Sequence, residues 1–468
     1  MVLLPLSLRC LGAPRLPLVL RPLPRVFPTS GAAASFTTSS ALLANPPKKA
    51  NPQKGGNVKN LKAIAAKQRA SSNKFQHKRK KKDIPVKKKH YLDGQRKVIK
   101  NTIILSNTNA PAITLPEMAK ELAGNPETEN TVFEIPGSVV DKLRHIEAFK
   151  TGQHWPYFQK PGTLVRKEST EIGAMINAVN EARLNKIELH ERRILDGVKG
   201  SGRSILLAQA MAWAFQSDWV VISIPNSLDL VLGHTEYEYD THWNVWVQKE
   251  YTAALLQRIH KANAPLLKIL ESTTPHRVGK TEKTFPTLLK LVDAGIEDST
   301  VSHDIFMALI AELSMTDRPP VLFALDNLSL ISRLSENRDT GFAKIHAHDL
   351  GIPNIFLSYL NGTKNFPRGL TIAATAPSPR TPDLTLALKG EKPGPWDKTD
   401  ERIAPSIEGA KVVNCEPLRK EEVKTLMDWY TAGGIYKGAV TLETVAESYA
   451  LSSGNPAELF KGCLRLKY

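Results

Sequence analysis

The chain contains little cysteine, which limits the disulfides and metal sites that it can form. Only Cys10, Cys415 and Cys463 occur among its 468 residues. Three thiols spaced so widely provide neither a disulfide framework nor a pair of neighbouring cysteine ligands for a metal ion. The sequence therefore predicts buried or unreactive thiols in a reducing compartment.

Long apolar runs are also missing. No segment offers the roughly 18 consecutive apolar residues that a membrane-spanning helix requires. Arginines and prolines interrupt the apolar N-terminal stretch, so it does not have the continuous apolar core of a secretory signal. Hydrophobic residues nevertheless make up 41% of the chain, which is compatible with a sizeable core. We therefore expect a largely folded protein without a membrane span.

Acidic residues are absent from residues 1–82. Four arginines are spaced through the first part of this segment: Arg9, Arg15, Arg21 and Arg25. A Ser/Thr/Ala-rich run follows at 30–44. This composition is typical of a mitochondrial transit peptide, which we assign to residues 1–44. A chloroplast transit peptide has a related composition, but the arginine spacing favours mitochondria, so we expect the protein in the mitochondrial matrix.

Residues 45–100 form a second segment, which is rich in Lys, Asn, Gln and Pro and too polar to bury a core. Residues 1–100 contain 23 Lys or Arg and only two acids, a net charge of +21, whereas the rest of the chain carries −4. The runs at 77–82 and 87–89 are dense enough to neutralise several phosphates each. A lysine run can also be a solvated tail or a nuclear signal. Because the preceding segment is predicted to direct the protein to mitochondria, we expect residues 45–100 to be a disordered arm that contacts RNA.

A strand, a glycine loop and a helix follow one another in the middle of the chain. After a helix expected at 170–187, a short apolar segment around Ile194 precedes GVKGSGRS (197–204) and the apolar run 205–215. This order is the context of a phosphate-binding loop, whose backbone N–H groups converge on phosphate oxygens at a helix N-terminus. Ser204 stands where a hydroxyl group would bind Mg²⁺. The pattern therefore predicts a nucleotide-binding site.

Two positions depart from the pattern of a hydrolytic site. Arg203 replaces the usual lysine and keeps the positive charge, but its planar guanidinium is wider than an ammonium. The run 317–331 predicts a buried strand ending at Asp326, an acid placed to hold the hydration shell of Mg²⁺. Asn327 follows where hydrolytic relatives usually carry glutamate, and an amide cannot act as a general base. We therefore predict nucleotide binding with little or no turnover and no catalytic residue.

The segments between residues 170 and 405 predict an α/β core with insertions. Further central strands are expected at 218–225 and 369–378, and Thr375 or Ser378 in the second could sense a γ-phosphate. The sequence contains no N-K-x-D motif, so it supplies no standard guanine-reading motif. The identity of the base therefore stays open.

Several other segments surround this predicted core. Residues 101–169 are predicted as an N-terminal extension packed on it. Residues 234–270 are predicted as an insertion whose helical pattern breaks at Pro265, and residues 378–405 as a Pro- and charge-rich loop. A strand, a helix and a terminal helix begun by a proline are expected within 406–468, which we assign to a C-terminal helical lid.

The order of these motifs resembles a known family. An acid-free leader, GVKGSGRS before an apolar helix, DWVVISIP, LFALDNLSLI and a terminal SGNPAELF together resemble the mitochondrial small-ribosomal-subunit family also called death-associated protein three, in a fungal version. The similarity runs from about residue 160 to the C-terminus. It implies an AAA+/STAND-like P-loop domain in the head of the small subunit. Members touch ribosomal RNA and neighbouring proteins and lie near bridges to the large subunit.

The resemblance also implies a site for a purine nucleotide. Members bind a guanine nucleotide, and GTP/GDP or ATP with Mg²⁺ is the expected cofactor here. The residues that would wrap the phosphates are Gly197, Lys199, Gly200, Ser201, Gly202, Arg203 and Ser204. Ser204 and Asp326 would serve the metal, the latter through water. Two alternatives stay open: a free mitochondrial AAA+-type ATPase or GTPase acting on RNA or protein, and a mitochondrial RNA-binding factor outside the ribosome.

Overall fold

The computed structural model describes most of the chain beyond its N-terminal hundred residues. The described residues are 105–376, 380–392, 394 and 399–465. The chain divides into two units, Met1–Arg96 and Lys97–Tyr468, and only the second contains described residues. The predicted transit peptide, the predicted basic arm and Ser378 lie outside them. None of the described helices combines the length and apolar content needed to cross a membrane.

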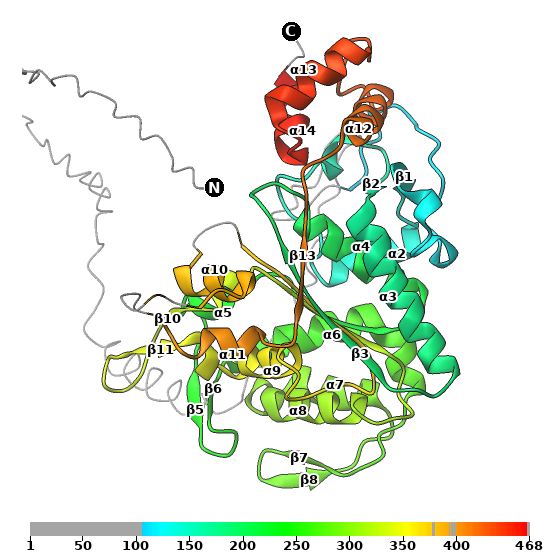
Figure 1. Ribbon diagram of the computed structural model, residues 1–468. Coiled ribbons are helices and arrows are strands. Elements are labelled where there is room, and N and C mark those ends of the chain that lie inside the picture. The colour runs from blue at the N-terminus through cyan, green and yellow to red at the C-terminus, as the bar shows by residue number, and fades with distance from the viewer. Residues whose placement is uncertain (1–104, 377–379, 393, 395–398, 466–468) are drawn as a thin grey trace, which may run out of the picture. The chain divides into compact units, whose positions relative to one another are not determined.

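A five-stranded parallel sheet forms the centre of the described part (Figure 1). Its strands are β3 (Leu189–Asp196), β4 (Val220–Ile224), β9 (Val321–Asp326), β12 (Arg368–Ala374) and β13 (Lys411–Asn414). Their order across the sheet is β13-β3-β12-β9-β4, and every pairing is parallel. The strand before the glycine loop and the strand ending in Asp326 therefore flank β12. This arrangement confirms the predicted α/β, AAA+/STAND-like P-loop fold class.

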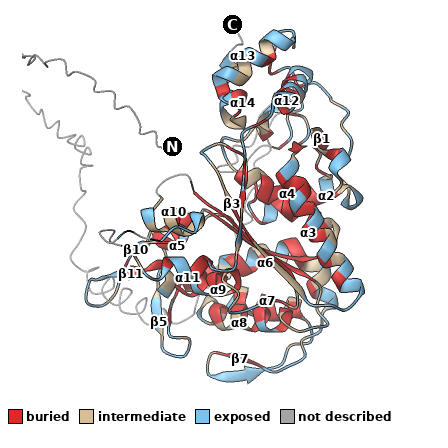
Figure 2. Ribbon diagram, in the orientation of Figure 1, coloured by how far each residue is buried: buried red, intermediate tan, exposed pale blue. Residues whose placement is uncertain are grey.

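Helices pack against both faces of this sheet. They are α3 (Lys167–Leu184) and α4 (Arg203–Gln216) on one face, and α6 (Lys249–Ile269), α7 (Leu288–Glu297), α8 (Ser302–Leu313) and α9 (Gly351–Leu360) on the other. In β4, Val220 and Ile222 pack with the second group, whereas Val221 between them packs with the first. The inner strand β9 and its neighbour β4 are buried at every position, which explains their continuous apolar runs in the sequence (Figure 2).

The segment before α3 packs on the core as an antiparallel ladder and a helix. Its elements are β1 (Thr131–Glu134), α2 (Gly137–His145) and β2 (Gly162–Val165). Phe133 and Leu143 belong to the same hydrophobic cluster as Met211 of α4. This packing brings the loop between α2 and β2 to the N-terminal end of α4.

Three helices at the C-terminal end form a separate group, coloured red to orange in Figure 1. They are α12 (Lys420–Ala432), α13 (Leu442–Ser452) and α14 (Pro456–Arg465). Their hydrophobic cluster includes Val132 and Leu164 from the β1–β2 ladder. The preceding strand β13, which the sequence assigned to the lid, belongs to the central sheet. Cys415 and Cys463 in this region are free and buried, as predicted.

Short helices and two-stranded hairpins lie around the central sheet. They are α5 (Leu228–Val231), α10 (Pro382–Lys389), α11 (Ile403–Ile407) and three hairpins, β5–β6 (Glu238–Asp240, Val245–Val247), β7–β8 (His276–Val278, Thr281–Lys283) and β10–β11 (Leu334–Arg338, Lys344–His346). The predicted loop at 378–405 thus contains helices. Thr381 caps α10 and Pro382 occupies its first turn, while buried Leu384 anchors it to the core. The prediction of a loop was wrong because this start signal was overlooked.

The predicted break at Pro265 was also wrong. Helix α6 runs through this residue without interruption to Ile269. A proline inside a helix removes one backbone hydrogen bond and disfavours the helix locally. Here Asn263 and Leu267, on either side of it, are both buried against the core. Tertiary packing of this face therefore outweighs the local cost at Pro265.

Candidate nucleotide-binding site

The glycine loop connects β3 to α4, as the sequence predicted. Gly200 and Gly202 have φ of 86° and 101°, a region that residues with side chains rarely adopt. A Cβ atom on Gly200 would also lie only 2.6 Å from Oδ1 of Asn455. A side chain at position 200 is therefore disfavoured both by the backbone conformation and by the lack of space. The loop ends at the N-terminus of α4, where unpaired N–H groups favour an anion.

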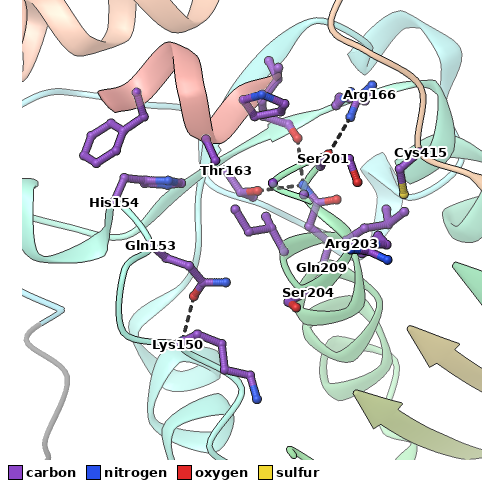
Figure 3. Close-up of a pocket in the computed structure, with 18 of the residues that line it drawn as sticks. Lys150, Gln153, His154, Thr163, Arg166, Ser201, Arg203, Ser204, Gln209 and Cys415 are labelled. Atoms are coloured by element: carbon purple, nitrogen blue, oxygen red, sulfur yellow. Dashed lines mark hydrogen bonds between the residues drawn. The ribbon is translucent and has the colours of Figure 1, made fainter. Parts of the chain in front are cut away.

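A cavity of about 480 Å³ opens beside this loop (Figure 3). Its lining comes from residues 150–154, from β2, from the loop at 199–204 and from the C-terminal helices. A volume of this size is ordinary for a small-molecule site. The loop residues Lys199 to Ser204 all contribute to the lining, whereas Gly197 makes the turn out of β3. Most of the predicted phosphate-binding residues therefore face one cavity.

Arg203, which replaces the usual lysine, is buried, lines the cavity and forms a hydrogen bond within the protein. Its Nη1 donates a hydrogen bond of 2.6 Å to Oγ1 of Thr375 and lies 4.0 Å from Oδ1 of Asp196. Thr375 donates from Oγ1 to the same Asp196 oxygen over 2.7 Å. The threonine that the sequence placed near a γ-phosphate therefore links Arg203 to the end of β3.

Asp196 carries the negative charge opposite two arginines. Its Oδ2 lies 3.0 Å from Nη2 of Arg380. Burial would raise the pKa of the Asp196 carboxyl group, but hydrogen bonds from Arg380, from Thr375 and from the backbone hold this pKa below its usual value. Because Asp196 stays ionised, it attracts Arg203 toward β3. Sequence analysis did not identify Asp196 or Arg380, since neither lies in a recognised motif position.

Ser204 and Asp326, which lie far apart in the sequence, meet at the first turn of α4. Oγ of Ser204 donates a hydrogen bond of 3.0 Å to Oδ2 of Asp326. The backbone N–H of Asn327 donates to the other carboxylate oxygen over 2.9 Å. Asp326 itself is only 4% exposed. The structure thus joins the hydroxyl and the acid that the sequence proposed for Mg²⁺.

Lys150 is a further member of this group that the sequence did not reveal. Its Nζ lies 3.4 Å from Oδ2 of Asp326 and also donates to the carbonyl oxygen of Pro225. Its backbone N–H donates to Oε1 of Gln153 over 2.7 Å, the bond drawn in Figure 3. Lys150 lies in the loop after α2, where no motif or periodicity marks it. Only the packing of that loop against α4 brings it to the site.

The C-terminal helices hold the glycine loop directly. Nδ2 of Asn455 donates a hydrogen bond of 2.7 Å to the carbonyl oxygen of Lys199. The N–H of Ala457 donates to the carbonyl oxygen of Gly200 over 3.3 Å. The SGNP sequence before α14 therefore both begins a helix and closes over the loop. Sequence analysis recognised only the first of these roles.

Arg166 fixes the loop from the opposite side. Its guanidinium donates to the carbonyl oxygens of Ser201, at 3.3 Å, and of Glu416, at 2.6 Å. The hydroxyl of Ser201 is buried, and among the described residues it has no hydrogen-bond partner. An unpaired buried hydroxyl is costly, so this group is suited to an oxygen of a bound ligand.

The far end of the cavity is aromatic. Its wall includes His154, Trp429, Tyr430 and Phe460. Burial lowers the pKa of His154 to about 4, so the imidazole is neutral near pH 7. The cavity therefore has a polar end at the glycine loop and an uncharged, aromatic end beneath the C-terminal helices. This polarity suits a ligand with an anionic part and a flat, weakly polar part.

Comparison with known proteins identifies the family. Residues 163–462 match the family described as mitochondrial ribosomal death-associated protein 3. The chain belongs to this family. It is 32% identical over 397 residues to the small ribosomal subunit protein mS29 of Neurospora crassa, covering 80% of this chain and 83% of that protein. The mS29 protein of Schizosaccharomyces pombe is 28% identical over 359 residues, covering 75% of this chain and 74% of that protein.

Membership of the family confirms the resemblance seen in the sequence motifs and the predicted mitochondrial matrix location. Among solved structures, Cdc6p from Pyrobaculum aerophilum aligns over 64% of this chain and 59% of that chain. The sequence identity is 13% and the TM-score 0.33, which is too low to support any argument about this site. The fold class therefore rests on the sheet order, the glycine loop and the family.

Proposed function

We propose that this chain is a structural component of the small subunit of the mitochondrial ribosome. The observation that carries this proposal is the match to mS29 of Neurospora crassa, which extends over 83% of that protein. In this role the chain contacts the small-subunit rRNA and neighbouring ribosomal proteins, and it reaches the large subunit through an intersubunit bridge. The excess of positive charge in residues 1–100 supports a contact with RNA phosphates.

The cavity beside the glycine loop takes a purine nucleotide, GTP/GDP or ATP. Support comes from the N-terminus of α4, from the unpaired Ser201 hydroxyl and from the aromatic wall. The phosphates would lie along the loop from Gly197 to Ser204, and the base would lie toward Trp429. Ser204 and Asp326 are the residues that would serve Mg²⁺. When bound, the metal would neutralise phosphate charge.

The nucleotide acts as part of the fold and is turned over little or not at all. Asn327 follows Asp326 where a general base would be needed, and its Nδ2 donates to Oδ1 of Asn226 over 3.0 Å. Arg203 is held by Thr375 and Asp196. A bound nucleotide would contact the loop, α4 and the C-terminal helices together, which favours the folded state by mass action.

Sedimentation of a mitochondrial lysate through sucrose gradients at moderate and at high salt tests the ribosomal role. We expect the chain to run with the small subunit in both gradients, because a ribosomal component is held by many neighbours as well as by charge. A chain that runs free, or leaves the particle at high salt, would contradict this proposal. Multiple-turnover hydrolysis of GTP or ATP by the isolated protein would favour a free ATPase or GTPase instead.

A further inference from the structure

A groove of about 630 Å³ lies beside the β10–β11 hairpin and shares no lining residue with the cavity at the glycine loop. Its lining comes from β6, from the hairpin and the residues just after it, and from the segment 399–402 before α11. These elements lie together in Figure 1. The groove is therefore a second hollow of the described fold, separate from the candidate nucleotide site.

The lining of this groove carries more acids than bases. Its four carboxylates and two cations are those of Asp339, Asp349, Asp400, Glu401, Lys344 and Arg402. Nζ of Lys344 already lies 2.9 Å from Oε2 of Glu336. Nη1 of Arg402 lies 3.1 Å from Oδ2 of Asp349. Among the described residues, no lysine or arginine forms an ion pair with the other three carboxylates of the lining. The groove therefore attracts a cation and repels a phosphate backbone.

His346 presents an unused hydrogen-bond donor to the same groove. Its side chain is only 5% exposed, yet it contributes to the lining. Burial lowers the pKa of the imidazole, so the ring is neutral near pH 7. Because Nδ1 accepts from the backbone N–H of His348 over 3.1 Å, the proton lies on Nε2. Nε2 lies 3.2 Å from Oδ2 of Asp400 without forming a hydrogen bond, and it has no hydrogen-bond partner among the described residues. This buried donor is therefore suited to an acceptor oxygen of a ligand.

Trp246 and Leu334 add apolar surface to the groove. Leu334 is 55% exposed. The rings of Tyr237 and Tyr239 pack edge-on against Trp246, and no cation of the described residues lies over its indole. Lysine and arginine bury their methylene stems on apolar surface, and their charges are attracted to the face of an indole. The groove therefore suits a lysine or arginine side chain better than a metal ion, which would gain nothing from the apolar part.

We propose that this groove binds a basic protein segment, whose lysine or arginine side chain enters beside Trp246 and Asp400 and whose backbone carbonyl oxygen accepts from Nε2 of His346. The inference rests on the proposed ribosomal role, because it gives the chemistry of one protein neighbour, and it does not depend on nucleotide binding at the glycine loop. A basic peptide satisfies both the acids and the imidazole donor. An RNA strand offers acceptor oxygens but no positive charge.

The first test titrates the full-length protein with a fluorescent ten-residue peptide of glycine and serine that carries three arginines. We expect the double variant Asp400→Asn/Glu401→Gln to bind this peptide about tenfold more weakly than wild type, which is ~1.4 kcal/mol. The first substitution keeps the oxygen that accepts from the N–H of Arg402, so the local fold should persist. The control Glu443→Gln/Glu447→Gln removes the same charge from exposed positions of α13 outside the groove and should behave as wild type. An equal loss in both double variants, or no loss in the first, would overturn the proposal.

The second test places a photo-crosslinking amino acid, p-benzoylphenylalanine, at position 401 of the chain in purified mitochondrial small subunits. Mass spectrometry then identifies the crosslinked segment, and we expect a segment of a neighbouring protein with net positive charge. A crosslink to RNA, to an acidic or neutral segment or to residues 45–100 of this chain would overturn the proposal, as would the absence of any crosslink. If the chain itself is missing from purified small subunits, the proposed ribosomal role fails, and the peptide titration alone then decides whether the groove binds basic segments.

Discussion

At the scale of single residues, two cations near the glycine loop lie beside two different carboxylates. Arg203 is bound by Thr375 and Asp196, and Lys150 lies at Asp326. The wide, planar guanidinium suits the paired contact with Thr375 and Asp196, whereas the compact ammonium fits beside one carboxylate oxygen. Arg203 and Lys150 therefore lie beside acids at the ends of two different strands, β3 and β9.

His303 in α8 allows a prediction about pH. It is buried, and burial lowers its pKa to about 4 although Asp304 and Asp240 oppose this shift. The unfolded chain binds a proton at this residue near pH 6.5, whereas the folded chain does not. The contribution of His303 to stability is therefore complete above pH 6.5 and is lost as the pH falls from 6.5 to 4.

We expect the free energy of unfolding to fall across that range, and His303→Gln to make the fall shallower by up to about 1.4 kcal/mol per pH unit. Urea unfolding of both proteins at several pH values measures the difference. Because His154, His190 and His348 also have lowered pKa values, part of the slope should remain in the variant. Parallel curves for the two proteins would contradict the assignment to His303.

At the scale of elements, the start of α14 connects the C-terminal helices to the glycine loop. Oδ1 of Asn455 accepts from the N–H of Ala457 at the first turn of α14, while Nδ2 donates to the carbonyl of Lys199. One side chain therefore begins a helix and holds the loop. A substitution at Asn455 can therefore separate the attachment of the C-terminal helices to the glycine loop from the stability of α14.

The variant Asn455→Asp tests this separation. An aspartate keeps the oxygen that caps α14, but it lacks the donor for the Lys199 carbonyl and adds a negative charge near the phosphates. We expect nucleotide affinity to fall about tenfold, ~1.4 kcal/mol, with little change in thermal stability of the nucleotide-free protein. Titration calorimetry and thermal unfolding monitor the two quantities. An equal loss in both would mean that Asn455 acts mainly through the helix.

At the scale of the described fold, segments that are remote in sequence converge on one cavity. Residues 150–154 come from the loop after α2, residues 199–206 from the glycine loop and α4, and Trp429 from α12. A ligand in this place contacts elements that are remote in sequence. Nucleotide binding should therefore stabilise these elements as one cooperative unit.

Removal of the nucleotide should lower the temperature of unfolding. A ligand at about one hundred times its dissociation constant adds ~2.7 kcal/mol to the folded state, provided that it does not bind the unfolded chain. Calorimetric scans of the protein before and after exhaustive dialysis, and again after adding GTP or ATP, measure this effect. A melting temperature that is the same with and without added nucleotide would contradict a role of the nucleotide in stability.

The sequence by itself predicted the parallel sheet, the glycine loop and the family. These depend on local signals: apolar runs for β4, β9 and β12, and glycines at positions whose backbone needs positive φ. It also predicted that Ser204 and Asp326 lie opposite each other, as their hydrogen bond shows, because the loop and the strand end are recognisable patterns. It erred at Pro265, where burial on both sides of the proline outweighs a local preference.

Only the tertiary structure decided the charge arrangement of the site. Asp196, Arg380 and Lys150 stand in no motif, and their roles arise from which strand ends and loops the sheet order brings together. Ion pairs between segments more than 170 residues apart, such as Asp196 with Arg380, leave no periodic trace in sequence. Local sequence patterns reflect the backbone conformation that each segment prefers. The cation beside Asp326 depends on packing between segments, which those patterns do not contain.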